Sequence, residues 1–200
     1  MLTIKSKYKI AKRLGAGVFD QTQTQKFALS AARKSTKKRG RNVSDYGRQL
    51  LEKQKVRYTY GLTEKQFAKY VGQSTGTKDP SALLHKLLEM RADNVVYRAG
   101  LASTRRAARQ AVSHGHIVVN GKRITTPSYT VKTGDVITIR TGSQRSPLFA
   151  GLAEAENQRS VVKWIETDFK LMKSTVTGEP TYQAVETGLE YTTVFEYYSR

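Results

Sequence analysis

A compact cluster of basic side chains lies on one predicted helix and the strand hairpin that follows it, within residues 91–140. Thr104 is typical of a helix N-cap, because its hydroxyl accepts a hydrogen bond from an amide of the first turn. His114-Gly115 predicts the end of that helix near Ser113, since glycine adopts the left-handed conformation of a C-terminal cap. At about 100° per residue, the arginines between them share roughly a third of the helix circumference. These arginines are Arg105, Arg106 and Arg109.

A strand hairpin is predicted directly after the helix. Ile117-Val118-Val119 predicts the first strand, Asn120-Gly121 is typical of a type I′ turn, and Lys122-Arg123-Ile124 predicts the returning strand. The pattern therefore places three guanidinium groups and the two cations beside the turn, Lys122 and Arg123, on one surface. Such a surface suits a folded polyanion.

Two histidines, His114 and His116, flank Gly115. A metal site would need further ligands, and neither a third histidine nor a cysteine lies nearby. We therefore predict a helix cap and a phosphate-facing imidazole at this position, with no metal and no cofactor.

The 200-residue chain carries a formal net charge of +19 and no cysteine. Residues 1–60 hold 16 Lys/Arg against 3 Asp/Glu, whereas residues 141–200 hold 6 against 8. A charge needed only for solubility would not segregate in this way, so nucleic acid is the expected partner. A membrane is not expected, because no apolar run approaches about 18 residues and no long helix places large apolar residues opposite the cations. The lack of cysteine excludes disulfides and thiolate zinc sites.

Residues 1–43 are predicted to form a basic N-terminal arm without apolar periodicity. Two interpretations stay open for the run 34–41: a solvated tail, or an arm that becomes ordered against phosphates and releases counterions as it binds. The start of the chain superficially resembles an organelle transit peptide but lacks its Arg and Ser richness, so an RNA-binding arm is preferred. Its candidate RNA contacts are Lys5, Lys7, Lys9, Lys12, Arg13, Lys37, Lys38, Arg39 and Arg41.

Residues 44–90 predict helices. Ser44 can cap a helix that runs to about Tyr58, and Thr63 with Gln66 makes a capping-box pattern. Pro80-Ser81 starts a further helix whose leucines repeat at helical spacing. The first of these helices carries the candidate RNA contacts Arg48, Lys53, Lys55 and Arg57.

Beyond residue 140 the pattern is less regular. Leu148 to Gln158 predicts a short helix, and 164–168 and 192–197 show partial strand alternation on either side of a turn at 178–180. The sequence contains neither a GxxxxGK[ST] phosphate loop nor a GxSxG elbow, so no catalytic residues are predicted.

Three segments resemble a known family. SxRRAARQxVxHGHIxVNGxxI, followed by PSYxVKxGDxI, is similar to the small RNA-binding domain named after ribosomal small-subunit protein 4. The segments RADNVVYR and SDYGxQLxEKQKxRxxYG, together with the final EYYSR, resemble the ribosomal protein itself more than other carriers of the domain. Two departures are Ala92, where the family usually has leucine, and TKKRGRN at 36–42, where it usually has a PGxHG-like turn.

The resemblance implies an α+β fold. It implies a basic extended arm over residues 1–43, a helical domain over residues 44–90 that is completed by about 159–200, and an inserted small α/β RNA-binding domain over residues 91–158. The insertion follows from the resemblance alone.

The resemblance also implies a structural component of the small ribosomal subunit that binds small-subunit rRNA and nucleates assembly around the 5′ domain. It implies a place beside ribosomal small-subunit protein 5, near the path by which mRNA enters, where decoding accuracy is influenced. The implied partners are rRNA and protein 5, with mRNA as a further candidate, and neither a membrane nor a second copy of the chain. A cytoplasmic ribosome is expected, with an organellar one as the less favoured alternative.

Two other function classes stay open. An RNA-modifying enzyme can carry the same domain, and Asp93 invites comparison with a catalytic aspartate of pseudouridine synthases. No segment is large enough for that catalytic domain, so pairing of Asp93 with Arg91 or Arg98 is the favoured role. The remaining class is a standalone RNA chaperone or stalled-ribosome factor, which is usually shorter and lacks the SDYG segment and the terminal YSR.

Overall fold

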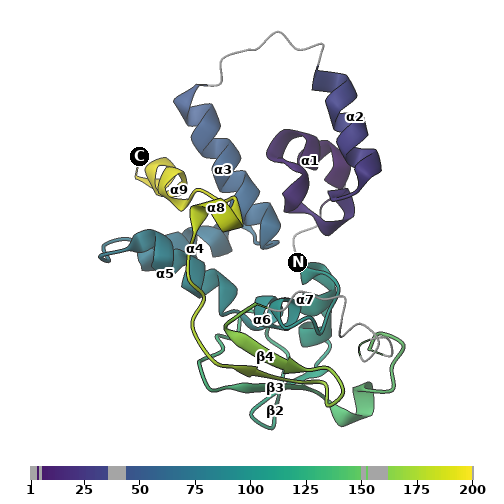
Figure 1. Cartoon of the computed structure of the whole chain (residues 1–200). Coiled ribbons are helices and arrows are strands. Elements are labelled where there is room, and N and C mark those ends of the chain that lie inside the picture. Colours follow the sequence, from purple (N-terminus) through teal and green to yellow (C-terminus); the bar gives the residue numbers. More distant parts are fainter. Residues whose placement is uncertain (1–3, 5, 36–43, 150–151, 153–161, 200) are drawn as a thin grey trace. The chain divides into compact units, whose positions relative to one another are not determined.

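The computed structural model describes residues 4, 6–35, 44–149, 152 and 162–199, and the chain forms two compact units (Figure 1). The helical unit comprises Met1–Leu84 and Tyr182–Arg200, and the sheet unit comprises His85–Thr181. The fold is α+β, as predicted. The sheet unit thus extends further in both directions than the predicted domain of residues 91–158.

The helical unit is built around the long helix α3 (Asp45–Thr59). The unit also contains α1 (Lys7–Leu14), α2 (Gln25–Ser35), α4 (Glu64–Ser74), α8 (Ala184–Thr187), α9 (Tyr191–Tyr198) and the 3₁₀ turns η1 (Ala16–Val18) and η2 (Asp20–Thr22). The predicted caps of α3 and α4 are confirmed. The Ser44 hydroxyl accepts from the Gly47 amide at 3.2 Å, and Thr63 and Gln66 form the reciprocal capping box.

Helix α5 (Pro80–Glu89) passes from the first unit into the second. Of its predicted core leucines, Leu84 and Leu88 are fully buried.

In the sheet unit, two helices cover one face of a five-stranded antiparallel sheet (Figure 1). The helices are α6 (Ala92–Arg98) and α7 (Arg105–Ser113). The strand order is β2-β1-β3-β5-β4, and a 3₁₀ turn follows β3. The bounds are β1 (Ile117–Val119), β2 (Lys122–Ile124), β3 (Val136–Ile139), η3 (Thr141–Ser143), β4 (Ile165–Asp168) and β5 (Lys173–Val176).

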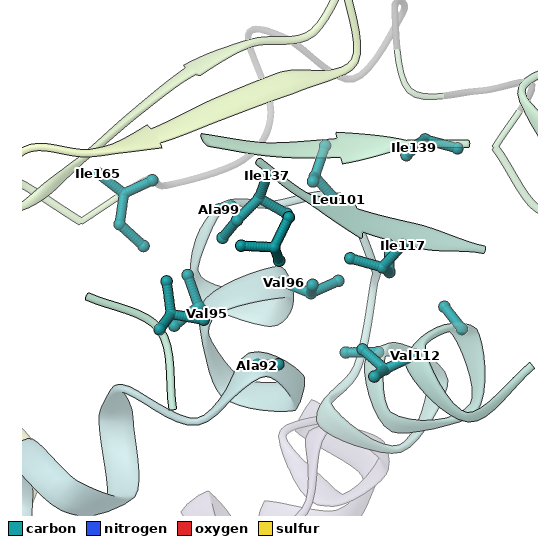
Figure 2. Packing of buried hydrophobic residues seen from close by; sticks show 14 of the residues in the cluster. Ala92, Val95, Val96, Ala99, Leu101, Val112, Ile117, Ile137, Ile139 and Ile165 are labelled. Carbon is teal, nitrogen blue, oxygen red and sulfur yellow. The ribbon is translucent and has the colours of Figure 1, made fainter. Parts of the chain in front are cut away.

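The core of the sheet unit lies between these helices and the sheet. Val95 and Val96 of α6 and Val112 of α7 point toward Ile117 and Ile137 of the sheet (Figure 2). All five side chains are fully buried. Because side chains alternate along a strand, the register Ile117↔Ile139 and Val119↔Ile137 puts these four apolar residues on the covered face.

The basic arm is helical rather than extended over the residues described. Phe19 contacts Tyr58 of α3 with ring centroids 6.3 Å apart, and Phe27 contacts Tyr8 at 6.1 Å. Ala11, Val18 and Phe27 are buried, so the arm does contribute apolar packing, at a spacing wider than one helical turn. Residue 5 and residues 36–43 lie outside the described part of the chain.

The segment Thr192–Tyr197 forms a helix, so the predicted strand alternation there is wrong. Tyr191 and Val194 are both buried, which is helical spacing, and α9 packs along α3. A short run rich in β-branched and aromatic residues is compatible with the period of a helix or of a strand. In this segment, packing against α3 favours the helix.

The stretch assigned to the helical domain after residue 159 is divided between the units. The predicted strand at 164–168 is confirmed as β4, but β4 and β5 extend the sheet through pairing of β5 with β3. The assignment of these strands to the helical domain is therefore wrong, because antiparallel hydrogen bonding ties them to the sheet unit. Of the helix predicted over 148–158, the described residues 148 and 149 form a turn, and the others except Leu152 lie outside the described part.

Among the helices described, none is long and apolar enough to cross a membrane.

Candidate nucleic-acid interface

Helix α7 is held in one rotational setting by its two caps and its apolar side. The Thr104 hydroxyl accepts from the Ala107 amide at 3.1 Å. At the other end Gly115 has φ +71°, and the His116 amide donates to the Ala111 carbonyl at 3.0 Å. Both predicted caps are confirmed, and the second is a Schellman motif. Ala108, Ala111 and Val112 face the core, so the opposite side of α7 faces solvent.

The hairpin β1–β2 closes with the predicted type I′ turn. Asn120 has φ +48° and Gly121 φ +78°, and Val119 pairs with Lys122. The Asn120 side chain also ties the turn to the next loop, since its Nδ2 donates to Asp135 at 2.8 Å and its Oδ1 accepts from the Val136 amide at 2.8 Å. The turn is therefore fixed on the side facing β3.

The two cations of β2 are exposed, and one of them reaches the end of α7. The Arg123 guanidinium donates to the His114 carbonyl at 3.2 Å and lies over Gly115, in the space that a Cβ would occupy there. A carbonyl at a helix C-terminus carries partial negative charge, which favours a cation at this position. Helix and hairpin thus meet at Arg123, and Lys122 lies beside it.

The three arginines of α7 occupy different environments. Arg106 is exposed and forms no ion pair with the residues described. The Arg105 guanidinium lies 4.5 Å from the centre of the Tyr97 ring and 3.8 Å from Glu89. Arg109 Nε lies 3.2 Å from Asp93 Oδ2, and its side chain is only 13% exposed. Two of the three arginines are therefore paired with buried acids, and the third is exposed.

Glu89, at the end of α5, is a fully buried carboxylate with two arginine neighbours. Arg98 binds it through two hydrogen bonds of 2.7 and 2.8 Å, and Arg105 approaches from α7. Burial alone would raise the pKa of this carboxyl, but the hydrogen bonds and charge of Arg98, with Arg105 and His85, outweigh it and lower the pKa to about 2. Glu89 is therefore ionised at neutral pH. Burial lowers the pKa of His85 below its usual value.

Asp93, in the first turn of α6, makes a second cluster of the same kind. Arg91 binds it through hydrogen bonds of 3.0 and 2.8 Å, and Arg109 approaches from α7. The Asn94 amide also donates to Asp93 at 3.0 Å. The predicted pairing of Asp93 with Arg91 is confirmed, and Arg98 pairs with Glu89 instead.

The two histidines beside Gly115 differ in exposure. His116 is half-buried, with Nδ1 2.9 Å from the Ser143 hydroxyl and its ring against Phe149. His114 is exposed. Among the residues described, no group of three side chains could hold a metal ion.

The candidate cations of α3 are mostly engaged within the helical unit. Lys53 is 6% exposed, lies 2.9 Å from Glu64 and sits under the Tyr197 ring, while Arg57 lies 3.2 Å from the same carboxylate. Burial pushes the pKa of Glu64 up, but the Tyr198 hydroxyl, Lys53 and Arg57 lower it overall. Lys55 pairs with Glu52 at 3.3 Å, and exposed Arg48 pairs with Asp45 at 2.9 Å. Lys53 and Arg57 therefore join α3 to α4 through Glu64, and Lys53 also contacts Tyr197 of α9, whereas Arg48 and Lys55 pair within α3.

In the arm, the cations of α1 lie close together on one short helix. Lys9, Lys12 and Arg13 are exposed, Lys7 donates to Gln21 at 2.9 Å, and Lys12 donates to Ser30 at 3.0 Å. The candidates Lys5, Lys37, Lys38, Arg39 and Arg41 lie outside the described residues.

Sequence reasoning passed over other exposed polar groups near this surface. Lys132 and Arg140 are exposed cations of the sheet unit, for which the only sequence signal was their charge. Gln110 is exposed one turn after Arg106, and their i, i+4 spacing could have identified it as part of the same side of α7.

Two family models match adjoining parts of the chain. The model described as "Ribosomal protein S4/S9 N-terminal domain" matches residues 3–90, and the model described as "S4 domain" matches residues 90–137. The "Small ribosomal subunit protein uS4" of Roseiflexus sp. (strain RS-1) is 40% identical over 197 residues, which is 96% of each chain. The chain belongs to the uS4 family. Similar proteins of that name from Lachnospira eligens (41% over 170 residues, 84% of this chain and 86% of the relative) and Hahella chejuensis (40% over 203 residues, 98% of each) extend the same relationship.

Membership of the uS4 family confirms the resemblance found in the sequence. The S4-domain match spans α6, α7, β1, β2 and the start of β3, which include the exposed cations of α7 and β2. The match at residues 3–90 spans the arm, α3, α4 and α5.

Proposed function

We propose that this chain is a structural component of the small ribosomal subunit and binds small-subunit rRNA directly. The observation that carries the proposal is the surface formed by α7 and the β1–β2 hairpin, where Arg106, Lys122 and Arg123 are exposed together and Arg123 joins the two elements. Planar guanidinium groups suit phosphate oxygens and stack on exposed bases. The names of the uS4 relatives support the same role, which requires no catalytic residue.

The finer role follows from the family resemblance. We propose that the protein nucleates assembly around the 5′ domain of the rRNA and influences decoding accuracy near the path by which mRNA enters. Its protein neighbour would be ribosomal small-subunit protein 5, with mRNA as a further contact, in a cytoplasmic ribosome. The arm, through Lys9, Lys12 and Arg13, supplies a second cationic surface on the helical unit.

The proposal is tested by salt-dependent binding. Wild-type protein and an in vitro transcript of bacterial small-subunit rRNA are titrated at several KCl concentrations, with the reverse-complement transcript as the matched RNA control. The affinity for rRNA should exceed that for the control and should fall steeply with salt, because each phosphate contact releases counterions. Equal affinity for both RNAs, or affinity insensitive to salt, would contradict the proposal.

Association with the subunit is tested separately by co-sedimentation. The protein should remain with small subunits through a high-salt wash, as an integral component does. Release at moderate salt would favour a transiently bound RNA chaperone or stalled-ribosome factor.

A further inference from the structure

The sheet unit contains two ion-pair clusters of the same design, and each ends on α7. In each, a buried carboxylate is bound by two hydrogen bonds to an arginine outside α7 and is approached by a second arginine from α7. Glu89 connects Arg98 with Arg105, and Asp93 connects Arg91 with Arg109. Both acids lie outside α7, on α5 and α6. The clusters therefore fasten one flank of α7 to its neighbours.

The fastened arginines have limited reach toward a ligand. The side chains of Arg105 and Arg109 are 21% and 13% exposed, and both are held against buried acids. If either arginine left its acid to reach a phosphate, the buried carboxylate would lose part of its charge compensation. That loss would cost free energy. Their geometry suits fixing the helix more than binding RNA.

The opposite side of α7 presents a different set of groups. Arg106, Gln110 and His114 are exposed at i, i+4 and i+8, so they form one stripe along the helix. Ser113 lies beside them, but its hydroxyl donates to the Arg109 carbonyl at 2.8 Å. Within the described part of the chain, neither Arg106 nor Gln110 has a side-chain hydrogen bond or ion pair. The stripe ends beside Arg123, which donates to the His114 carbonyl.

The chemistry of this stripe suits recognition of RNA shape and base edges more than bulk charge. It has one cation, one amide that both donates and accepts, and one imidazole. Amides and imidazoles recognise base edges and 2′-hydroxyls by directed hydrogen bonds, whereas phosphate contacts fix position without distinguishing sequence. We propose, on the basis of the function proposed above, that the RNA-facing side of α7 is the stripe Arg106, Gln110 and His114. In this proposal Arg105 and Arg109 are positioning residues, which Glu89 and Asp93 hold on the flank.

Net charge alone would give Arg106 and Arg109 the same effect on RNA binding. Four single variants distinguish the two roles proposed for them. Arg106→Gln removes a cation from the stripe, Gln110→Ala removes an uncharged group from it, and Arg109→Gln removes a cation from the flank. Lys163→Gln is the matched control, because Lys163 is an exposed cation elsewhere in the sheet unit. Each variant is made in the full chain and titrated against the rRNA transcript and its reverse complement over a KCl series, and its melting temperature is measured.

The stripe variants should change binding without changing stability. Arg106→Gln should lower the slope of log affinity against log salt by about one, the value expected for one lost phosphate contact. Gln110→Ala should weaken rRNA binding by about fivefold, which corresponds to about one net hydrogen bond, and should leave both the salt slope and the control RNA unchanged. An unchanged rRNA affinity of Gln110→Ala, or an equal loss on both RNAs, would overturn the assignment of the stripe.

The flank variant should do the reverse. Arg109→Gln should lower the melting temperature and leave the salt slope at the wild-type value, whereas Lys163→Gln should change neither. A slope lowered by about one at an unchanged melting temperature would make Arg109 a phosphate contact and overturn its positioning role.

Asp93→Asn keeps the test decisive if Arg109→Gln does not fold. This variant leaves the Arg109 charge in place and weakens its attachment, together with that of Arg91. A lower melting temperature supports the positioning role, and an unchanged melting temperature contradicts it. If wild-type protein prefers neither RNA, the proposed function fails. If it prefers rRNA but the variant pattern is reversed, only the assignment within α7 fails.

Discussion

A single buried carboxylate, Glu89 of α5, forms ion pairs with arginines of both α6 and α7. Its two arginine partners lie on α6 and α7, so the ionised side chain compensates charge on both helices. An acid whose pKa is lowered on folding stabilises the folded state above its ordinary pKa, and that stabilisation is lost as pH falls through the folded value. For Glu89 the window runs from about 4.5 down to about 2.

We expect Glu89→Gln to destabilise the protein at pH 7 by about 3 kcal/mol, which is the order that the lowered pKa implies. The difference in melting temperature between wild type and variant should shrink as pH is lowered toward 2, because the wild-type carboxyl then binds a proton. Thermal unfolding followed by circular dichroism at several pH values measures this. Glu166→Gln, on an exposed strand position of the same unit, is the control and should show neither effect. A gap that stays constant with pH would contradict the assigned role.

Gly115 is constrained twice, by its backbone conformation and by the side chain above it. We expect Gly115→Ala to cost more stability than Gly134→Ala, although both glycines have positive φ, +71° and +89°. The left-handed strain of roughly 1 kcal/mol applies to both. Only at position 115 would the new methyl group overlap the Arg123 guanidinium, whereas nothing lies within 4 Å at position 134.

Chemical denaturation of the two variants gives the comparison directly. Combining Gly115→Ala with Arg123→Ala should remove most of the extra loss, because the guanidinium is then absent. If the double variant is no more stable than Gly115→Ala alone, the overlap is not the cause.

The N-terminal arm contributes to packing as well as to charge. Ile10 and Leu14 of α1 line one hollow together with Leu50 and Leu51 of α3, and Phe19 contacts Tyr58. Deleting residues 1–42 should therefore weaken rRNA binding and also lower the melting temperature of the helical unit, since it exposes this side of α3.

The truncated protein tests both parts of this expectation. Its melting curve is compared with that of Lys9→Gln/Lys12→Gln/Arg13→Gln, which removes exposed arm cations and keeps the apolar contacts. The charge variant should lose rRNA affinity at an unchanged melting temperature. A truncated protein as stable as wild type would show that the arm adds no packing energy.

The features that sequence predicted correctly depend on neighbours within a few residues. The Thr63–Gln66 capping box and the Asn120-Gly121 turn are formed by side chains and dihedral angles three residues apart or closer, so a local pattern is sufficient. The S4-like segments added the family and the α+β class, which local patterns could not supply.

The features that sequence missed depend on distant contacts. The partner of Arg105 is Glu89, on another helix, and no spacing rule connects them. Tyr198 donates to Glu64 at 2.6 Å across most of the chain, and the same packing makes α9 a helix where alternation predicted a strand. The candidate site was therefore predicted as a region, whereas the division of its arginines into exposed and paired required the fold.

The protein carries a formal net charge of +19. Either this total or the placement of the individual cations governs how tightly the protein binds rRNA. We expect Arg106→Gln/Lys122→Gln/Arg123→Gln to weaken rRNA binding at least tenfold more than Lys163→Gln/Lys170→Gln/Lys173→Gln. Both triple variants lose three exposed cations from the sheet unit, so their net charge is equal. Placement matters because only the first set is concentrated on α7 and the hairpin, and one lost phosphate contact costs far more than a distant charge screened by salt.

Filter binding of both triple variants to the same rRNA transcript at one salt concentration gives the ratio. Melting temperatures are measured alongside, so that a folding defect is not mistaken for lost contacts. Equal losses of affinity would mean that the protein attracts RNA through its net charge alone.

The discontinuous helical unit has a consequence for the order in which the protein folds during its own synthesis. Helix α3 packs against α9 through the Gln49–Glu196 hydrogen bond of 3.1 Å and the contact of Tyr60 with Tyr191 at 3.3 Å. All of His85–Thr181 lies between them in the chain. Domains generally fold as units while the chain emerges. We therefore expect the sheet unit, with its α7 surface, to fold on the nascent chain before α9 is synthesised. Until then α3 lacks the helix that packs against it.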